Sequence, residues 1–566
     1  MGHRLSAMSE SRRLFLGARF LTFDKSQSQA SAVLVDGEKI VAVGGADELR
    51  AHTAGAEIVD LGGAIAMPGF VDAHIHGLSQ ALGAEELSLF GTESLEQAMA
   101  ALAEYAAGVP DGEWVIGAGW DFTKWGLDTQ PDRAHLEKAA PNNPVALWSI
   151  DYHTLWANGL ALEEAGVGPH TPDPHDGEFV REPGGRLTGI IREGAAELVK
   201  VAIPDPSASA AADALKIQQR TWLSEGLTGL HEIEGELSRQ AWLELGQRGE
   251  QDIRVVKYLR PQELAWAKSS GWRTGEGDSW FHHGGLKLFA DGALGSHTCH
   301  MSSPFPPTEG EEAPNYGAEV ISEDALTDAM VEAYRAGIVP IVHAIGDQAV
   351  HQVLGAYERS AGEHRAAERR LGRTLRRRIE HAQFVQPGDI QRFADLEVIA
   401  SMQPRHCISD LHLLAQIPLD AELAGYAWTQ LEDAGAALAF GSDSPVEPST
   451  PWAAVYAAMT RADISGDRSS TYQPERRMSA YRAIAAHTSG AAFAAGRESV
   501  SGRIAPGMEA DFITVDTNPL AREGADGAAS FAEAYPDEDA LFEQAEAIRD
   551  ARVETAVVGG QVRFSR

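Results

Sequence analysis

The sequence predicts an α/β protein: a parallel (β/α)8 barrel of the TIM type, a small β-sandwich domain from both chain ends, and an inserted α/β subdomain after the first barrel strand. Three observations predict this fold. The chain has 566 residues, more than one ordinary domain needs. Eight short apolar runs follow one another, most of the later ones after helix-like stretches. Strand-like segments with glycine turns lie near both ends of the chain.

The two chain ends have the composition of short strands. Residues 14–23, 31–44 and 56–66 alternate apolar runs with turn residues, and Asp36-Gly37 is a hairpin signal. Residues 502–516 and 551–566 have the same character, so we expect 13–66 and 503–566 to form one β-sandwich domain. The acidic, alanine-rich segment 521–550 between them predicts an exposed excursion.

The barrel strands are predicted from the eight apolar runs. They lie at 64–76, 226–233, 253–259, 285–292, 337–347, 377–385, 397–404 and 436–443. These runs predict a (β/α)8 barrel made of residues 67–80 and 205–502. The gap between the first and second runs is far longer than one barrel helix requires, so residues 81–204 are expected to form the inserted subdomain, a candidate lid.

The composition of the chain excludes several kinds of binding partner and indicates the cellular compartment. The formal net charge of −35 excludes a backbone-binding nucleic-acid partner and an anionic membrane surface. Two cysteines exclude a disulfide framework. No apolar run approaches the roughly 20 residues that cross a bilayer, and the first apolar stretch is interpreted as a strand instead of a signal peptide. A cytoplasmic enzyme, with a homodimer as the default assembly, is therefore expected.

Polar side chains occur within or at the ends of five of these runs. They are His74, His76, Lys287, His343, His381 and Asp443. Barrel active sites form at the carboxyl ends of the strands, so all six are expected at one mouth. Residues i and i+2 of a strand share a face, which allows the first two histidines to bind one metal ion.

Each of these residues also has a structural interpretation. A lone strand-end histidine is more often a hydrogen-bonded core or surface group, and Asp443 alone would be a turn or N-cap residue. Lys287 could pair with Asp291, although a buried amine is costly. The combination favours metal chemistry, because a neutral lysine that adds CO₂ becomes a carbamate that can bridge two metal ions.

With these motifs the chain resembles the amidohydrolase superfamily and, within it, the amidohydrolase-3 branch, the YtcJ-like hydrolases that include N-substituted formamide deformylases. The resemblance extends from about residue 13 to 565 and rests on the segments 117–126, 151–162, 286–298, 341–350, 379–384, 403–410 and 441–448.

The resemblance implies a binuclear metal centre. It implies His74 and His76 on the more buried ion, His343 and His381 on the other, and Lys287 as the carbamate bridge. Asp443 would ligate the buried ion and act as the catalytic proton carrier. Zinc is the first expectation, and manganese, iron, cobalt and nickel suit the same ligands.

Further residues are expected to contact a small-molecule substrate. The candidates are His153, His406, Trp120, Asp121 and His297. His297 and Tyr152 depart from the residues that this branch commonly has at their positions, which indicates an altered pocket. Trp125 and Trp156 are expected in the core of the insert. His231 is a candidate lining residue, with Glu232 as an alternative structural partner for it.

The expected activity is hydrolysis of a non-peptide C–N bond in an amide, N-formyl compound, carbamate or cyclic amide, by attack of metal-bound hydroxide with Asp443 as general base and acid. One alternative is another reaction on the same fold, such as deamination or lactone or ester hydrolysis. A non-catalytic scaffold relative is the other, but it would be expected to lack some of the six ligands.

Overall fold

The computed structural model describes residues 12–52, 55–127, 129–150, 153–175, 177–307, 313–415, 417 and 423–566. The chain separates into two compact units. One unit combines the N-terminal residues up to 80 with residues 215–566, and the other consists of residues 81–214.

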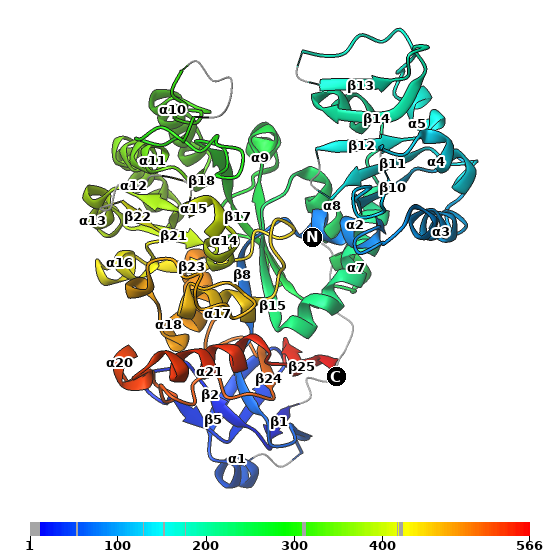
Figure 1. Cartoon of the computed structure of the whole chain (residues 1–566). Helices are drawn as coiled ribbons and strands as arrows, with labels where there is room; N and C mark the ends of the chain where they lie inside the picture. The colour runs from blue at the N-terminus through cyan, green and yellow to red at the C-terminus, as the bar shows by residue number, and fades with distance from the viewer. Residues whose placement is uncertain are drawn as a thin grey trace. The chain divides into compact units, whose positions relative to one another are not determined.

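An eight-stranded parallel sheet forms the centre of the first unit (Figure 1). Its strands are β8 (Phe70–Ile75), β15 (Leu227–Glu232), β16 (Arg254–Leu259), β17 (Phe281–Phe289), β18 (Pro340–Ala344), β19 (Arg377–His381), β21 (Val398–Met402) and β23 (Leu438–Phe440). Each strand pairs with the next in chain order. Seven strands lie within the predicted runs, and β17 begins four residues before the run predicted at 285–292 and overlaps it. The prediction of the barrel is confirmed.

The first and last strands meet where they end. The Asp443 amide donates to the His74 carbonyl at 2.7 Å, and the Ser442 amide donates to Asp72 Oδ1 at 3.0 Å. The same Asp72 oxygen accepts from the His74 amide. The side chain of Asp72 therefore ties the carboxyl end of β8 to the segment that follows β23.

Helices lie between the barrel strands along the chain. They include α7 (Ala208–Glu225), α8 (Glu236–Arg248), α9 (Leu264–Ser270), α10 (Glu323–Arg335), α11 (Asp347–Arg359), α12 (Ala361–Leu371), α13 (Pro387–Asp395) and α16 (Trp428–Asp433), and α17 (Pro451–Thr460) follows the last strand. In α10, Ser322 caps the Ala325 amide, and Leu326, Met330 and Ala333 are buried at the spacing of one helical face.

Two sheets from both chain ends pack on a shared core. The first contains β1 (Arg13–Leu16), β4 (Ala32–Asp36), β5 (Lys39–Gly44) and β6 (Glu57–Asp60). The second contains β2 (Arg19–Leu21), β3 (Gln29–Ala30), β7 (Ile65–Pro68), β24 (Phe512–Val515), β25 (Val553–Val558) and β26 (Gln561–Ser565). Phe15 and Phe512 meet edge to face at 5.0 Å in this core. The predicted hairpin is present, with Gly37 at a φ of 59° in its turn.

The expectation of an exposed excursion over 521–550 is wrong for its C-terminal part. Residues Glu538–Arg549 form the helix α21, capped by Asp537, whose side chain accepts from the Ala540 amide. Leu541, Phe542 and Ile548 of this helix are buried. The acidic composition belongs to the solvent-facing side of an amphipathic helix.

The second unit is a six-stranded mixed sheet with helices. Its strands are β9 (Leu87–Ser88), β10 (Val115–Trp120), β11 (Val145–Ser149), β12 (Thr154–Ala157), β13 (Gly177–Arg181) and β14 (Leu187–Glu193), in the spatial order β13-β14-β12-β11-β10-β9. Its main helices are α3 (Leu95–Ala106), α4 (Arg133–Ala139) and α5 (Gly159–Glu164). Trp120, Trp125 and Trp156 lie in its core, as expected for the last two.

None of the described helices combines the length and the apolar character needed to cross a lipid bilayer.

Candidate metal centre

His74, His76 and Asp443 form the first ligand group, at the carboxyl ends of β8 and β23. Nε2 of each histidine lies 3.3 Å from Asp443 Oδ1. His74 is fully buried, and the His76 side chain is 24% exposed. The two imidazoles that the sequence places one residue apart therefore converge on one carboxylate oxygen.

This spacing fits one shared metal ion. Two ligand atoms at about 2.1 Å from one zinc ion in tetrahedral geometry lie roughly 3.4 Å apart. Although burial opposes the charge of Asp443, the two facing histidines hold the pKa of this carboxyl well below its usual range. Burial also opposes the charge of His76, but its contacts with Asp443 and Glu234 raise the pKa of this ring to about 9. A bound cation would displace that proton, since ligation requires the neutral imidazole.

A second ligand group contains His381, His406 and Asp443. Each offers one ligand atom, and these atoms lie within 4.8 Å of one another. His406 Nε2 lies 3.7 Å from Asp443 Oδ2. This atom and His381 Nδ1 are buried and have no described hydrogen-bond partner, as expected for atoms that await a ligand. His406, predicted as a substrate contact, thus lies among the candidate metal ligands.

His343 stands next to this second group but is not part of it. Its ring lies 4.4 Å from the His381 ring, and its Nε2 donates to the Gly292 carbonyl at 3.0 Å. Since Nε2 is used in this way, Nδ1 is the nitrogen with the free lone pair. Burial first, and then the charge of Lys287, lowers the pKa of His343 to about 3, so the ring is neutral and able to ligate.

Lys287 is a buried amine at the centre of these histidines. Its Nζ lies 3.4 Å from His74 Nε2 and 5.2 Å from the centre of the Phe289 ring. No described carboxylate forms an ion pair with it, so the alternative pairing with Asp291 is not present. Burial lowers the pKa of Lys287 to about 7, which makes the neutral, CO₂-reactive amine accessible.

Asp291 has a different set of partners. Its carboxylate accepts from the amides of Ile345, Gly346 and His300. Burial nevertheless raises the pKa of Asp291 to about 7. Its Oδ1 also lies 3.5 Å from His343 Nε2, so Asp291 shapes the loop around that histidine.

Glu380 was not singled out from the sequence, yet it orients a proposed ligand. Its Oε2 accepts from His74 Nδ1 at 2.6 Å, and this contact leaves Nε2 free to face Asp443. Histidines that bind metals commonly donate their other nitrogen to such a carboxylate. Arg378, which is completely buried, contacts Glu380 Oε1 through Nε at 2.8 Å. His231 contacts the same guanidinium at 3.0 Å, so it belongs to this interior network.

Two of the site residues have backbone conformations that side chains rarely adopt. His381 has a φ of 72° and Asp443 a φ of 62°, both in the left-handed region. Such strain persists only where the surrounding structure enforces it, and it is concentrated at functional sites. His381 is the last residue of β19, and Asp443 lies in the segment that follows β23, so both are at the carboxyl ends of barrel strands.

The other predicted substrate contacts lie in varied surroundings. His297 stacks on Phe305 with ring centres 4.7 Å apart. The remaining three belong to the second unit: Trp120 is buried and donates to the Leu147 carbonyl at 2.8 Å, Asp121 accepts from the Thr123 amide, and the exposed His153 contacts Glu193 at 3.1 Å. Tyr152 lies outside the described residues.

Comparison with known proteins gives matches over most of the chain. The family described as Amidohydrolase family matches residues 57–564. The chain is 30% identical over 539 residues to Protein LONG AFTER FAR-RED 3 of Arabidopsis thaliana, covering 92% of this chain and 90% of that protein. It is 28% identical over 529 residues to N-substituted formamide deformylase of Arthrobacter pascens, and the match covers 90% of this chain and 94% of that protein. Putative amidohydrolase YtcJ of Bacillus subtilis is 27% identical over 518 residues, covering 89% and 94%.

Solved structures show the same architecture. An uncharacterized metal-dependent hydrolase from Pyrococcus furiosus superposes with a TM-score of 0.75 at 26% identity, over 90% of this chain and 100% of that one. An uncharacterized metal-dependent hydrolase from Pyrococcus horikoshii superposes with a TM-score of 0.75 at 25% identity, over 92% of this chain and 100% of that one. The zinc complex of atrazine chlorohydrolase from Arthrobacter aurescens shares the fold at a TM-score of 0.51 and 15% identity, over 98% and 95%.

Proposed function

The chain belongs to the amidohydrolase family and is a metal-dependent hydrolase of that superfamily, and from this premise we propose that it hydrolyses a non-peptide carbon–nitrogen bond. The proposed substrates are amides, N-formyl compounds, carbamates or cyclic amides. N-substituted formamides are the class to test first, because a relative with that named activity matches 90% of this chain.

The position of Asp443 is the observation that carries this proposal. One carboxylate oxygen faces Nε2 of both His74 and His76, and the other faces His406. A carboxylate held between two histidine groups can bind a cation and exchange a proton with a substrate in the barrel mouth.

We propose that His74, His76 and Asp443 hold one divalent ion and that His343 and His381 hold a second, with Lys287 as a carbamate between them. Zinc is the first candidate, and manganese, iron, cobalt and nickel fit the same donors. Two bound ions would supply a Lewis acid for the substrate carbonyl and lower the pKa of water to near neutrality.

The chain's own residues supply the proton transfers and the positioning. Asp443 takes a proton from the attacking water and returns it to the nitrogen of the leaving amine, which otherwise departs poorly as an anion. Glu380 keeps the His74 ring in the tautomer that directs Nε2 inward. His406 and His297 are proposed to contact the substrate.

Lys287 favours this reaction over a one-metal deamination. A buried amine that has no described carboxylate partner is costly unless it is modified or neutral. In a site with two ions, a carbamate on Lys287 binds both of them. In a site with one ion, the modified lysine would have no second ion to bind. Two equivalents of metal per chain would support this choice.

The proposal is tested by assaying metal-reconstituted protein with N-formyl, N-acyl and carbamate compounds. Asp443→Asn keeps the shape of the side chain but loses its charge, and we expect its kcat to fall by at least about a hundredfold. Asp324→Asn, the same chemical change at a side chain that is 83% exposed on α10, is the matched control and should keep most activity. Equal turnover by Asp443→Asn and the wild type would remove Asp443 from the mechanism.

A further inference from the structure

A cavity lies at the opposite end of the barrel strands from the candidate metal centre. Its volume is about 240 Å³. His282 and His283, near the start of β17, line it, whereas Lys287 lies near the end of the same strand. Val339 and Arg376, which directly precede β18 and β19, also line it. The cavity is thus at the amino-terminal face of the barrel, away from the mouth that holds the candidate ligands.

Positive charge exceeds negative charge among the lining residues. Arg376 pairs with Glu498 at 2.5 Å, which neutralises one guanidinium. Arg373 donates to the Thr274 carbonyl at 3.3 Å and has no carboxylate partner among the described residues. The whole chain carries 82 acidic and 47 basic residues, so an uncompensated guanidinium beside a cavity runs against the average charge of the protein.

Two donors at the cavity have no described acceptor. Arg376 Nε is buried without a hydrogen-bond partner. His282 Nδ1 lies 3.4 Å from the Arg497 guanidinium, which Glu509 holds through two contacts of 2.7 Å. A nitrogen that faces a donor carries the lone pair, so the proton of His282 is on Nε2. A ligand acceptor in the cavity would satisfy Arg376 Nε, since buried polar atoms are rarely left unpaired, and His282 Nε2 offers it a second donor.

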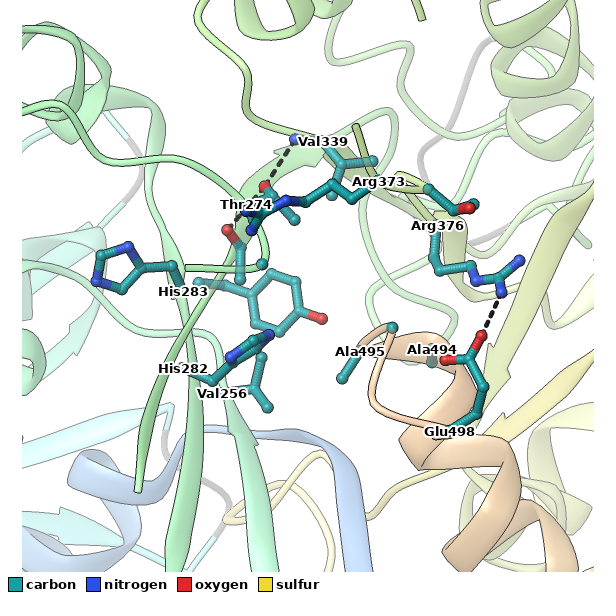
Figure 2. A pocket seen from close by; sticks show the side chains of 15 residues that line it. Val256, Thr274, His282, His283, Val339, Arg373, Arg376, Ala494, Ala495 and Glu498 are labelled. Carbon is teal, nitrogen blue, oxygen red and sulfur yellow. Dashed lines mark hydrogen bonds and ion pairs between the residues drawn. The ribbon is translucent and has the colours of Figure 1, made fainter. Parts of the chain in front are cut away.

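Part of the lining is apolar. Val256, Val339 and Ala495 supply hydrocarbon surface, and Tyr258 adds an aromatic ring. Figure 2 shows Arg373 and Thr274 along one side of the cavity, the Arg376–Glu498 pair on another, and His282 and Val256 below. Small-molecule sites combine an apolar lining with a few polar groups in the same way.

We propose that this cavity binds a small organic anion, a carboxylate on a compact apolar or aromatic body, with Arg373 as its main charge partner. The carboxylate accepts from Arg373 and from His282 Nε2, and the body packs on Val256 and Ala495. Burial, and after it the charge of Arg497, lowers the pKa of His282 to about 3, which is consistent with a positive potential around a neutral ring.

The experiment uses metal-loaded full-length protein and benzoate as the probe, with benzyl alcohol as its uncharged analogue, in isothermal titration calorimetry. Benzoate is expected to bind at least about tenfold more tightly than benzyl alcohol, because a charge-assisted contact is lost with the alcohol. Arg373→Gln should weaken benzoate binding by about tenfold. Arg369→Gln, which removes an exposed charge on α12, should leave it within about twofold.

Crystals soaked with 4-bromobenzoate then locate the ligand by the anomalous signal of bromine. The expected peak lies between Val256 and Ala495. A peak only at the metal centre, no binding at all, equal affinity for the alcohol, or unchanged affinity in Arg373→Gln would each overturn the proposal.

Discussion

Glu380 holds the ring of His74 so that its Nε2 faces Asp443. The six candidate ligands lie in or just after the carboxyl-terminal parts of barrel strands, where a barrel gathers polar side chains, so their type and position predicted a common site. Glu380 also lies near a strand end, next to His381, but its partner His74 is 306 positions away in the sequence. Nothing local indicates this pairing, because only the closed barrel brings β8 and β19 close enough for contact.

Replacing Glu380 by Gln is expected to weaken metal binding. The amide cannot accept from His74 Nδ1 as strongly and leaves the buried Arg378 without its charge partner. We expect the affinity for the first ion to fall by about 10- to 100-fold. Competition with a metal-sensitive dye measures this affinity, and a thermal melt checks that the variant is folded.

The exposed Glu397 gives the matched control, since Glu397→Gln makes the same chemical change away from the site. If Glu380→Gln bound metal as tightly as this control, the orienting role of Glu380 would be refuted.

At the level of elements, continuous burial made the strands predictable. Strands β15, β16, β19 and β21 are buried at every position. Strand β21 is mostly apolar, as expected of a buried parallel strand. Strand β19 has the sequence RRIEH, and its charged side chains are buried with partners, as in the Arg378–Glu380 pair. Helix α21 was missed because four acidic residues in its sequence favour solvent and obscure the spacing of Leu541, Phe542 and Ile548. The limits of the three domains remain a prediction.

Phe542→Ala tests the packing of α21. The ring is fully buried, and the Arg468 guanidinium lies 4.6 Å from its centre. Removal of such a side chain costs about 3–5 kcal/mol of unfolding free energy. Glu543→Ala, at a side chain that is 76% exposed, should cost less than about 0.5 kcal/mol. Denaturant midpoints of both variants measure the difference in their unfolding free energies. Similar midpoints would show that α21 does not contribute to the hydrophobic core.

At the level of the whole molecule, stability should depend on buried neutral histidines. His487 lies between the rings of Phe70 and Phe440, at 5.7 and 5.6 Å. Burial lowers the pKa of His487 to about 3. Above the ordinary histidine pKa of about 6.5, His487 is neutral in both the folded and the unfolded states. In that range it does not make the free energy of unfolding depend on pH. Below that value only the unfolded chain takes up the proton, and stability falls until the pH reaches the folded pKa.

His487→Leu should therefore lose less stability than the wild type between pH 6.5 and pH 5. The expected difference approaches about 1.4 kcal/mol per pH unit at the lower end. Unfolding midpoints over this range measure it, with the exposed His170→Leu as control. Parallel curves for His487→Leu and the wild type would contradict the assignment.

We propose that six side chains, distant in sequence, hold metal ions at one mouth of the barrel. Anomalous diffraction from zinc-loaded crystals grown with bicarbonate, combined with metal analysis of the wild type and of Lys287→Met, decides whether they do. We expect two zinc peaks, one among His74, His76 and Asp443 and one beside His343 and His381. We also expect density for a carbamate on Lys287 and loss of at least one ion in the variant. An active, zinc-loaded protein with an unmodified Lys287, or with its metal bound elsewhere, would refute this arrangement.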